Sequence, residues 1–344
     1  MAVKIVVAPD SFKECLDAES VSRIIADEII KNRPDWEVIC CPLSDGGEGF
    51  SMFLTEALLG DLVTTRVTGP LGDTVECFYG RVGNTAILDA ASCCGLQLVP
   101  EGQRNPLRTT SRGLGELMMD AFRRGCDNFI IGLGGSATCD GGVGMMSVEG
   151  IRELEGAVTM EVLCDVRNPF VGEDGAAKVF GPQKGASPEE VVLLEKRMLE
   201  RADRIREDTG IDVSFLPGTG AAGGLAGALY AYFEAELRPG IAAVLDYLDF
   251  EEIASGASWI ITGEGRSDSQ TLSGKVPLGV LLHAGDSKVA LISGTITEKE
   301  ALAKVGFERL IEVTPAGIPL HEALNPVVAE RNLRNAVREF LSVK

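Results

Sequence analysis

Short apolar runs rich in β-branched residues alternate with helix-like segments along this chain, and this alternation constrains the fold more than any other feature. Strands that alternate with helices favour a parallel sheet with right-handed crossovers. The candidate strands of one such sheet lie at residues 4–8, 37–41, 129–132, 258–262, 289–293 and 310–313. We therefore predict an α/β fold with an open, doubly wound, mostly parallel six-stranded sheet of the Rossmann-like type.

The stretch at 62–90 departs from this rhythm. Its residues alternate between apolar and polar, and turn signals stand at Gly69-Pro70 and Gly83-Asn84, a pattern typical of antiparallel strands. A chain of 344 residues is also long for a single domain. We therefore predict a Rossmann-like domain and an inserted second α/β domain of the α+β kind. The first comprises 1–60, 107–142 and 256–344, and the second comprises 61–106 and 143–255.

Composition excludes several classes of partner. The formal net charge of −19 argues against nucleic acid, because phosphate binding needs a basic surface, and it disfavours an anionic membrane for the same reason. We find no signal-peptide pattern at the N-terminus and no apolar run near the roughly 20 residues of a membrane span. Nine cysteines, with two adjacent pairs among them, fit a reduced compartment, and two histidines make a zinc site improbable. We expect a cytoplasmic protein that binds neither nucleic acid nor membrane.

The predicted sheet brings several polar loops together. In an open doubly wound sheet, ligands bind beyond the carboxyl ends of the strands, at the point where the winding changes direction. If the strand order is the common 3-2-1-4-5-6, that point lies between the loops Pro9–Lys13 and Gly263–Asp268. The loops Ser44–Gly49 and Gly134–Gly142 would lie on the same edge, and each of these loops contains carboxylates or paired glycines.

Glycine-rich loops suggest phosphate binding. The loop Gly134–Gly142 follows a predicted strand, so its backbone N–H groups could bind phosphate oxygens. Two stretches, Gly132–Ala137 and Gly218–Gly223, fit dinucleotide-binding patterns but lack the acidic residue and the simple βαβ context. We therefore disfavour a nicotinamide or flavin cofactor, and we favour a tight helix entry for the second stretch. A Walker loop is absent from the sequence.

Several single polar residues could have either a functional or a purely structural role. Asp45, between a strand end and two glycines, suits a functional role, whereas Glu14 and Glu48 suit helix capping. Asp165 could hold Mg²⁺ or a hydroxyl group, or it could form an Asx turn before Pro169. Lys184, between glycines, could reach a phosphate or be solvated. Both histidines fall in predicted helices outside the glycine loops, so a carboxylate would have to act as the base.

Several of these stretches, taken together and in order, resemble the bacterial glycerate kinase family over nearly the whole chain. They are Ala8–Glu14, Ser44–Gly49, Gly134–Gly142, Asp165–Pro169, Phe180–Ala186, Pro217–Gly224, and Ile261–Thr271 with Gly274-Lys275. The family usually has Ala, Thr and Asn where Ser44, Phe50 and Cys139 stand here. The segment between Gly150 and Glu161 also looks shorter than usual, which affects the edge of the second domain more than the chemistry.

The resemblance implies transfer of the γ-phosphoryl group of ATP to D-glycerate, with Mg²⁺, in a cleft between the two domains. The expected product is 2-phosphoglycerate, with 3-phosphoglycerate as the alternative. On this basis we nominate a catalytic, a substrate-binding and a nucleotide-binding set. The catalytic candidates are Asp45, Asp165 and Asp268, of which Asp165 and Asp268 are also the Mg²⁺ candidates. The glycerate-binding candidates are Asp10, Ser11, Lys13 and Arg266. The nucleotide-binding candidates are Gly134, Gly135, Ser136, Thr138 and Lys184.

Two other functions stay open at this point. One is a kinase for another small hydroxy acid, and the other is a non-catalytic metabolite-binding protein on the same scaffold. Pocket shape, which would decide between hydroxy acids, cannot be read from the sequence. A homodimer is compatible with these expectations.

Overall fold

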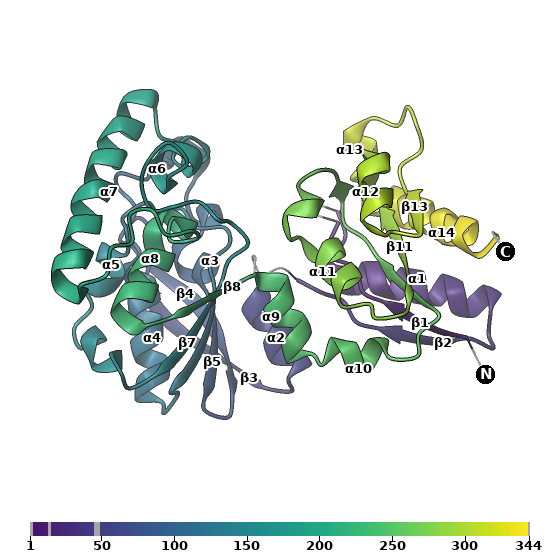
Figure 1. Ribbon diagram of the computed structural model, residues 1–344, viewed down its shortest axis with the longest axis horizontal. Helices are drawn as coiled ribbons and strands as arrows, with labels where there is room; N and C mark the ends of the chain where they lie inside the picture. The colour runs from purple at the N-terminus through teal and green to yellow at the C-terminus, as the bar shows by residue number, and fades with distance from the viewer. Residues whose placement is uncertain (1–2, 13–14, 45–48, 343–344) are drawn as a thin grey trace. The chain divides into compact units, whose positions relative to one another are not determined.

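The computed structural model describes residues 3–12, 15–44 and 49–342, and it divides into two compact units (Figure 1). Unit 1 comprises Met1–Asp45 and Ile241–Lys344, and unit 2 comprises Gly46–Gly240. Each unit has its own sheet and its own apolar core. The prediction of an α/β fold is confirmed. In the described part of the chain, no helix is long and apolar enough to cross a membrane.

Unit 1 is built on a five-stranded parallel sheet with the order β13-β11-β9-β1-β2. Its strands are β1 (Lys4–Val7), β2 (Glu37–Cys40), β9 (Trp259–Thr262), β11 (Lys288–Ser293) and β13 (Arg309–Glu312). The strand order changes direction between β1 and β9, as predicted. The short strands β10 (Arg266–Ser267) and β12 (Thr295–Ile296) pair with each other beyond this sheet.

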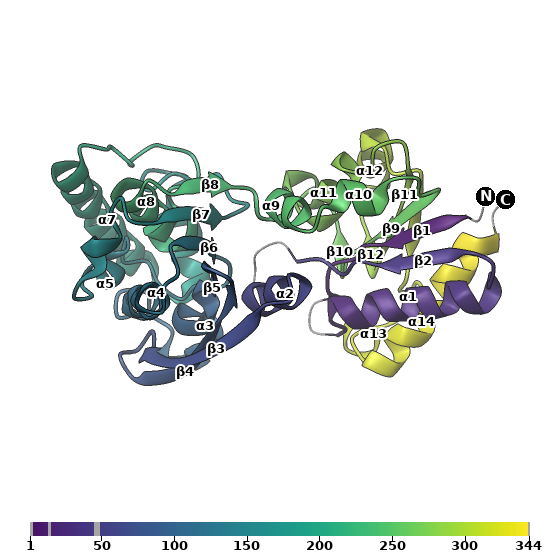
Figure 2. The same cartoon turned by 90° about the horizontal axis from the view of Figure 1, so that it is seen from below.

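Helices cover both faces of this sheet (Figure 2). On one face, α1 (Ala18–Asn32) packs against α14 (Pro326–Ser342). Their apolar faces share one core cluster with β1, β9 and β11, because Ile25 and Val337 are buried with Ile5. The remaining helices of the unit are α9 (Gly240–Tyr247), α10 (Phe250–Ala254), α11 (Val276–Leu282), α12 (Lys299–Val305) and α13 (Leu320–Ala323).

The predicted sixth strand of this sheet was wrong. Residues 128–132 form β6 (Asn128–Gly132), which pairs in parallel with β5 (Thr85–Asp89) and β7 (Thr159–Leu163) in the sheet of unit 2. A buried apolar run has the same pattern in either sheet, so the sequence alone could not choose its partners. The two units also differ in their bounds from the predicted domains. Segments 46–60 and 107–142 belong to unit 2, and 241–255 belongs to unit 1.

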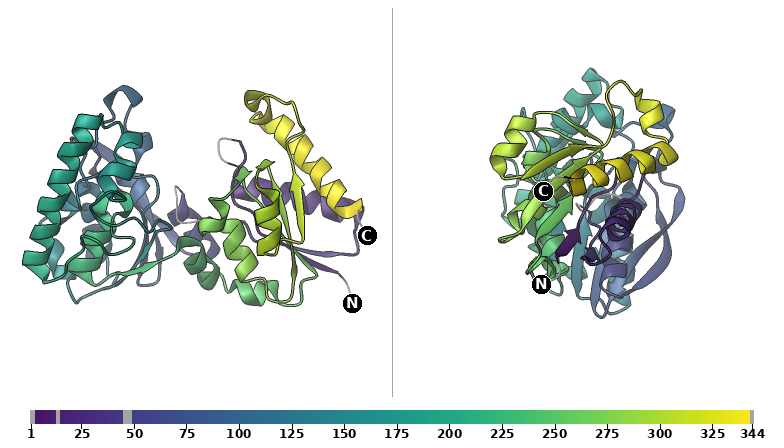
Figure 3. Two further views of the ribbon diagram at one scale, coloured as in Figure 1. Left: turned by 45° about the horizontal axis from the view of Figure 1, so that its top comes forward. Right: turned by 90° about the vertical axis from the view of Figure 1, so that its right-hand side faces the viewer.

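Unit 2 contains a six-stranded mixed sheet with the order β3-β4-β5-β6-β7-β8. β3 (Asp61–Thr68), β4 (Thr74–Val82) and β5 pair antiparallel, as predicted for 62–90, whereas β5 to β8 (Glu236–Arg238) are parallel. The helix α7 runs along one flank of the unit (Figure 3). The helices are α2 (Phe50–Ala57), α3 (Ala90–Cys94), α4 (Arg112–Arg123), α5 (Val143–Met146), α6 (Ala176–Phe180), α7 (Pro188–Thr209) and α8 (Ala221–Phe233).

The parallel half of unit 2 therefore has a carboxyl edge of its own. The register pairs Asp89 with Gly132 and Gly132 with Leu163, so the loops after β5, β6 and β7 leave the sheet side by side. Helices α4 and α8 pack on one face of these strands, because Leu117 and Leu229 share a buried cluster with Phe129.

A close backbone contact fixes the carboxyl end of β9 in unit 1. A Cβ atom on Gly263 would lie 1.8 Å from the carbonyl oxygen of Ile292, and that oxygen belongs to the backbone of β11. The position therefore requires glycine, because no flexible side chain can move away.

We expect Gly263→Ala to lower the free energy of unfolding by about 1–3 kcal/mol, because overpacking forces the backbone to shift. Gly102→Ala is the matched control, since a Cβ there would meet nothing within 4 Å; its effect should stay within about 0.5 kcal/mol. Urea unfolding measures both variants. Equal stability of the two variants would contradict the close contact.

Candidate active site

The loops after β1 and β9 meet at the switch point of the unit 1 sheet. The amide N of Asp10 donates to the carbonyl oxygen of Gly263 over 2.8 Å, and Leu43 N donates to Pro9 O over 2.9 Å. The predicted neighbours Pro9–Lys13 and Gly263–Asp268 are thus joined by backbone hydrogen bonds, with the end of the β2 loop beside them. Two candidates of this edge, Lys13 and Asp45, lie outside the described residues.

Arg266 and Asp268 come together on the loop after β9. Arg266 Nε lies 3.2 Å from Asp268 Oδ2, and the guanidinium-bearing side chain is mostly exposed. The other oxygen of Asp268 accepts the amide of Gln270, so the carboxylate also shapes its own loop. On the neighbouring loop, buried Asp10 accepts the amide of Ser11 through Oδ1 at 2.6 Å. An anion approaching Arg266 would therefore meet a cation that is already paired with Asp268.

Glu264 is a buried carboxylate that we did not nominate from the sequence. It is 5% exposed, and its Oε1 accepts hydrogen bonds from Ser267 Oγ at 3.0 Å and Thr271 Oγ1 at 2.5 Å. Lys275 Nζ lies 3.6 Å from Oε2. Burial raises the pKa of Glu264, and these partners offset only part of that shift. An acidic residue between two glycines looks like a solvated loop residue, which is why it was missed.

The glycine loop 134–142 lies in unit 2, at the carboxyl end of β6. Loop residues Gly135 and Ala137 bond to the segment after β5, since Leu96 N donates to Gly135 O at 2.8 Å and Ala137 N donates to Cys94 O at 2.7 Å. Gly135 has a φ of +72°, which favours glycine. The loop is thus held by backbone bonds and also by its own Asp140, whose Oδ2 accepts the amide and the hydroxyl of Ser111 at 2.9 and 2.8 Å.

Lys184 connects to this loop through its side chain. It is 4% exposed, and its Nζ donates to Ser136 Oγ at 3.0 Å and to the carbonyl oxygen of Thr138 at 2.7 Å. Within the described chain, no carboxylate forms an ion pair with it. Burial lowers the pKa of Lys184 to about 8. Three nominated nucleotide-binding residues are therefore in direct contact, and their cation is paired only with neutral oxygens.

Thr138 adds a second unusual polar group. Its side chain is fully buried, and among the described residues its hydroxyl oxygen has no hydrogen-bond partner. A buried hydroxyl without a partner lowers stability, and such groups are few in native proteins. The stretch Gly218–Gly223, in which we favoured a helix entry, packs here: a Cβ on Gly223 would lie 2.1 Å from Thr138 O.

Two carboxylates flank the glycine loop on the same sheet edge. Asp165 follows β7, is half-buried, and accepts the amide of Gly240 through Oδ1 at 2.8 Å. Asp89 ends β5, is 2% exposed, and accepts Ala91 N at 2.8 Å and Gly49 N at 2.9 Å. Asp89 was missed from the sequence, because the stretch 62–90 was interpreted as antiparallel strands only.

The described residues form no preformed metal-binding site. Among the described residues, no group of three or more His, Cys, Asp or Glu side chains is placed to hold a metal ion. The nominated Mg²⁺ ligands Asp165 and Asp268 lie in different units. Mg²⁺ is commonly bound by one or two carboxylates together with substrate phosphates. The carboxylate of Asp165, beside the glycine loop, fits that donor set.

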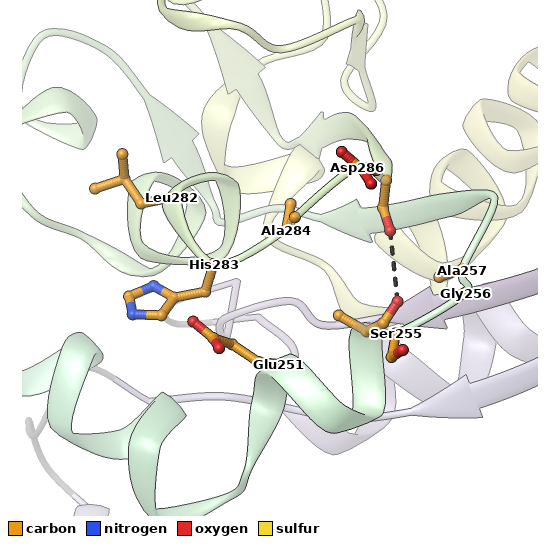
Figure 4. Close-up of a pocket in the computed structure, with 11 residues that line it drawn as sticks. Glu251, Ser255, Gly256, Ala257, Leu282, His283, Ala284 and Asp286 are labelled. Carbon is orange, nitrogen blue, oxygen red and sulfur yellow. Dashed lines mark hydrogen bonds between the residues drawn. The ribbon is translucent and has the colours of Figure 1, made fainter.

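A hollow of about 530 Å³ lies elsewhere in unit 1 (Figure 4). Its wall includes Glu251, Ser255, His283 and Asp286, on the segments that lead into the amino ends of β9 and β11. Ser287 Oγ donates to Ala254 O at 3.4 Å across its rim. None of the nominated residues lines it, so it is separate from the carboxyl-edge loops.

Comparison with known proteins gives one consistent result. A sequence model described as the glycerate kinase family matches residues 5–157 and 147–343. A relative from Bacillus subtilis (strain 168), named glycerate kinase, is 40% identical over 354 residues that cover 93% of each chain. A relative from Escherichia coli (strain K12), named glycerate 2-kinase, is 41% identical over 328 residues that cover 86% of each chain.

A solved structure agrees with these relatives. The crystal structure of a glycerate kinase 2 candidate from Salmonella typhimurium LT2 is similar to this chain with a TM-score of 0.85 at 40% identity, and the match covers 99% of this chain and 97% of that one.

The hydroxyl of Thr138 can be tested without a ligand. We expect Thr138→Val to leave the free energy of unfolding unchanged or to raise it, because the valine removes a buried polar group that has no partner. Thr109→Val is the matched control, since Thr109 Oγ1 donates to Ala137 O at 3.0 Å; it should cost about 1 kcal/mol. Denaturant unfolding compares them, and an equal loss in both variants would contradict the assignment.

Proposed function

The chain belongs to the glycerate kinase family, and we propose that it transfers the γ-phosphoryl group of ATP to D-glycerate and releases 2-phosphoglycerate. The observation that carries the proposal is the buried Lys184, whose ammonium donates to two neutral oxygens of a glycine loop. Such a cation is available to neutralise phosphate. The name of the E. coli relative supports the 2-position over the 3-position.

Phosphoryl transfer depends mainly on positioning the reactants and neutralising charge. In our proposal, Lys184 and the hydroxyls of Ser136 and Thr138 bind the phosphates of ATP, with Gly134 and Gly135 allowing their close approach. The lack of a partner for the Thr138 hydroxyl supports this assignment. Mg²⁺ would supply further charge neutralisation, with Asp165 as its protein ligand, because Asp165 lies on the same sheet edge as the glycine loop.

Unit 1 would supply the acceptor site. Asp10, Ser11 and Arg266 lie on its two switch-point loops, and Lys13 completes the nominated set. Glycerate has two hydroxyls and a carboxylate, so it needs both hydrogen-bond acceptors and a cation. Either Asp45 or Asp268 would take the proton of the attacking hydroxyl, since a carboxylate is the available kind of base. The expected location of the active site in a cleft stays a prediction.

A coupled ADP-release assay over small hydroxy acids tests this function directly. We expect ADP release with D-glycerate and Mg²⁺, with much slower release for lactate, which lacks one hydroxyl. The position of the phosphate in the product follows from ³¹P and ¹H NMR. No ADP release with D-glycerate would refute the proposal. Phosphorylation at the 3-position would correct only its regiochemistry.

The pKa of Lys184 gives the nucleotide site a pH dependence. Because burial lowers this pKa to about 8, the ammonium form that attracts phosphate is lost as pH rises through that value. We expect the Kd for MgATP to rise about tenfold between pH 7 and pH 9, as the charged fraction falls to roughly a tenth. Calorimetry measures the affinity at each pH. Lys184→Met should bind weakly at both, and a wild-type affinity independent of pH would exclude this role.

A further inference from the structure

Gly274-Lys275 lies in the region that resembles the family and is not among the nominated site residues. Lys275 follows the short helix η5 (Thr271–Ser273) and precedes α11. Gly274 has a φ of +112°, a conformation that a side chain would strain. This turn directs Lys275 back to the loop after β9, where its ammonium lies 3.6 Å from Glu264 Oε2.

Glu264 is fixed from two sides, whereas Lys275 is only partly covered. The Oε1 atom of Glu264 is held by the hydroxyls of Ser267 and Thr271, and Ser267 Oγ also bonds to Ser293 Oγ at 2.8 Å. The side chain of Lys275 keeps an exposed fraction of 32%, compared with 7% for that of Glu264. The arrangement is a buried, immobilised carboxylate that orients a partly exposed ammonium.

A purely stabilising ion pair explains this arrangement poorly. Burial raises the pKa of Glu264 despite the two hydroxyls and Lys275. A carboxyl whose pKa is raised on folding stabilises the fold below its unfolded pKa and loses that contribution as pH rises. Ionisation of Glu264 in the folded chain therefore lowers stability, as is common for buried charges. Charged groups kept at such a cost concentrate at functional sites.

We propose that Lys275 is a further binding residue of this site, which contacts the carboxylate of the hydroxy-acid substrate, and that Glu264 is the residue that positions it. The inference rests on the proposed function. Lys275 lies on the same loop system as Arg266 and Asp268, at the carboxyl end of β9. A singly charged carboxylate suits the site, because the negative charge of Glu264 close to the ammonium would oppose a triphosphate.

Calorimetry on the full-length protein, with D-glycerate and without nucleotide, tests the inference. We expect Lys275→Met to weaken glycerate binding at least tenfold and Lys275→Arg to restore part of the loss. Glu264→Gln should weaken binding about fivefold or more while its Tm stays equal to or above that of wild type. The stability of Glu264→Gln separates positioning from a structural role, which would lower Tm. Lys299→Met is the control, because Lys299 pairs with Glu312 in the same unit.

The outcomes are distinct. If the wild type releases ADP with D-glycerate but Lys275→Met binds glycerate as tightly as wild type, the inference is overturned and the proposed function stands. A weaker affinity for MgATP with unchanged glycerate binding would also overturn it, because Lys275 would then serve the nucleotide. Glycerate neither bound nor phosphorylated by the wild type would overturn the function and the inference together.

Discussion

The parallel pairing of β1 with β9 is the contact on which unit 1 depends. Thr262 Oγ1 donates to Ala8 O at 2.8 Å across 254 positions of sequence, and the bond from Asp10 N to Gly263 O continues the pairing into the two loops. The strand order changes direction here, and in open α/β sheets such a point is where ligands bind. The bonded network around Glu264 begins at the same point, directly after β9.

Much of this fold could be predicted from the local sequence pattern. The errors in the prediction concern which strands pair with each other. The strands of unit 1 and the antiparallel strands at the start of unit 2 were predicted from periodicity. A strand buried on one face alternates between apolar and polar residues, and a strand buried on both faces is a continuous apolar run. Strand β6 was assigned to the wrong sheet, since its apolar run fits either one. For β5, one of two partners was predicted. It pairs antiparallel with β4 and parallel with β6, and only the antiparallel pairing leaves a turn signal in the sequence between the strands.

The part of the candidate site that lies in glycine-rich loops could be predicted from the sequence, because glycines mark positions where the backbone packs closely. The contact of Lys184 with Ser136 and Thr138 joins two segments that the sequence had suggested as phosphate ligands, although their roles remain predictions. Glu264 and Asp89 could not be found in this way. Their burial depends on strands that are distant in sequence, and an acidic residue in a loop is ordinarily solvated.

The division of the chain also has a consequence for how the protein forms. Unit 2 is one continuous segment, Gly46–Gly240, whereas unit 1 combines residues from before and after it. On the ribosome, β1 emerges long before its partner β9, while every strand of the second sheet is synthesised before β9. Contacts between distant segments form slowly, because the chain between them must first be brought together. The continuous unit can therefore fold during synthesis, whereas the sheet of unit 1 can be completed only after β13 has been synthesised.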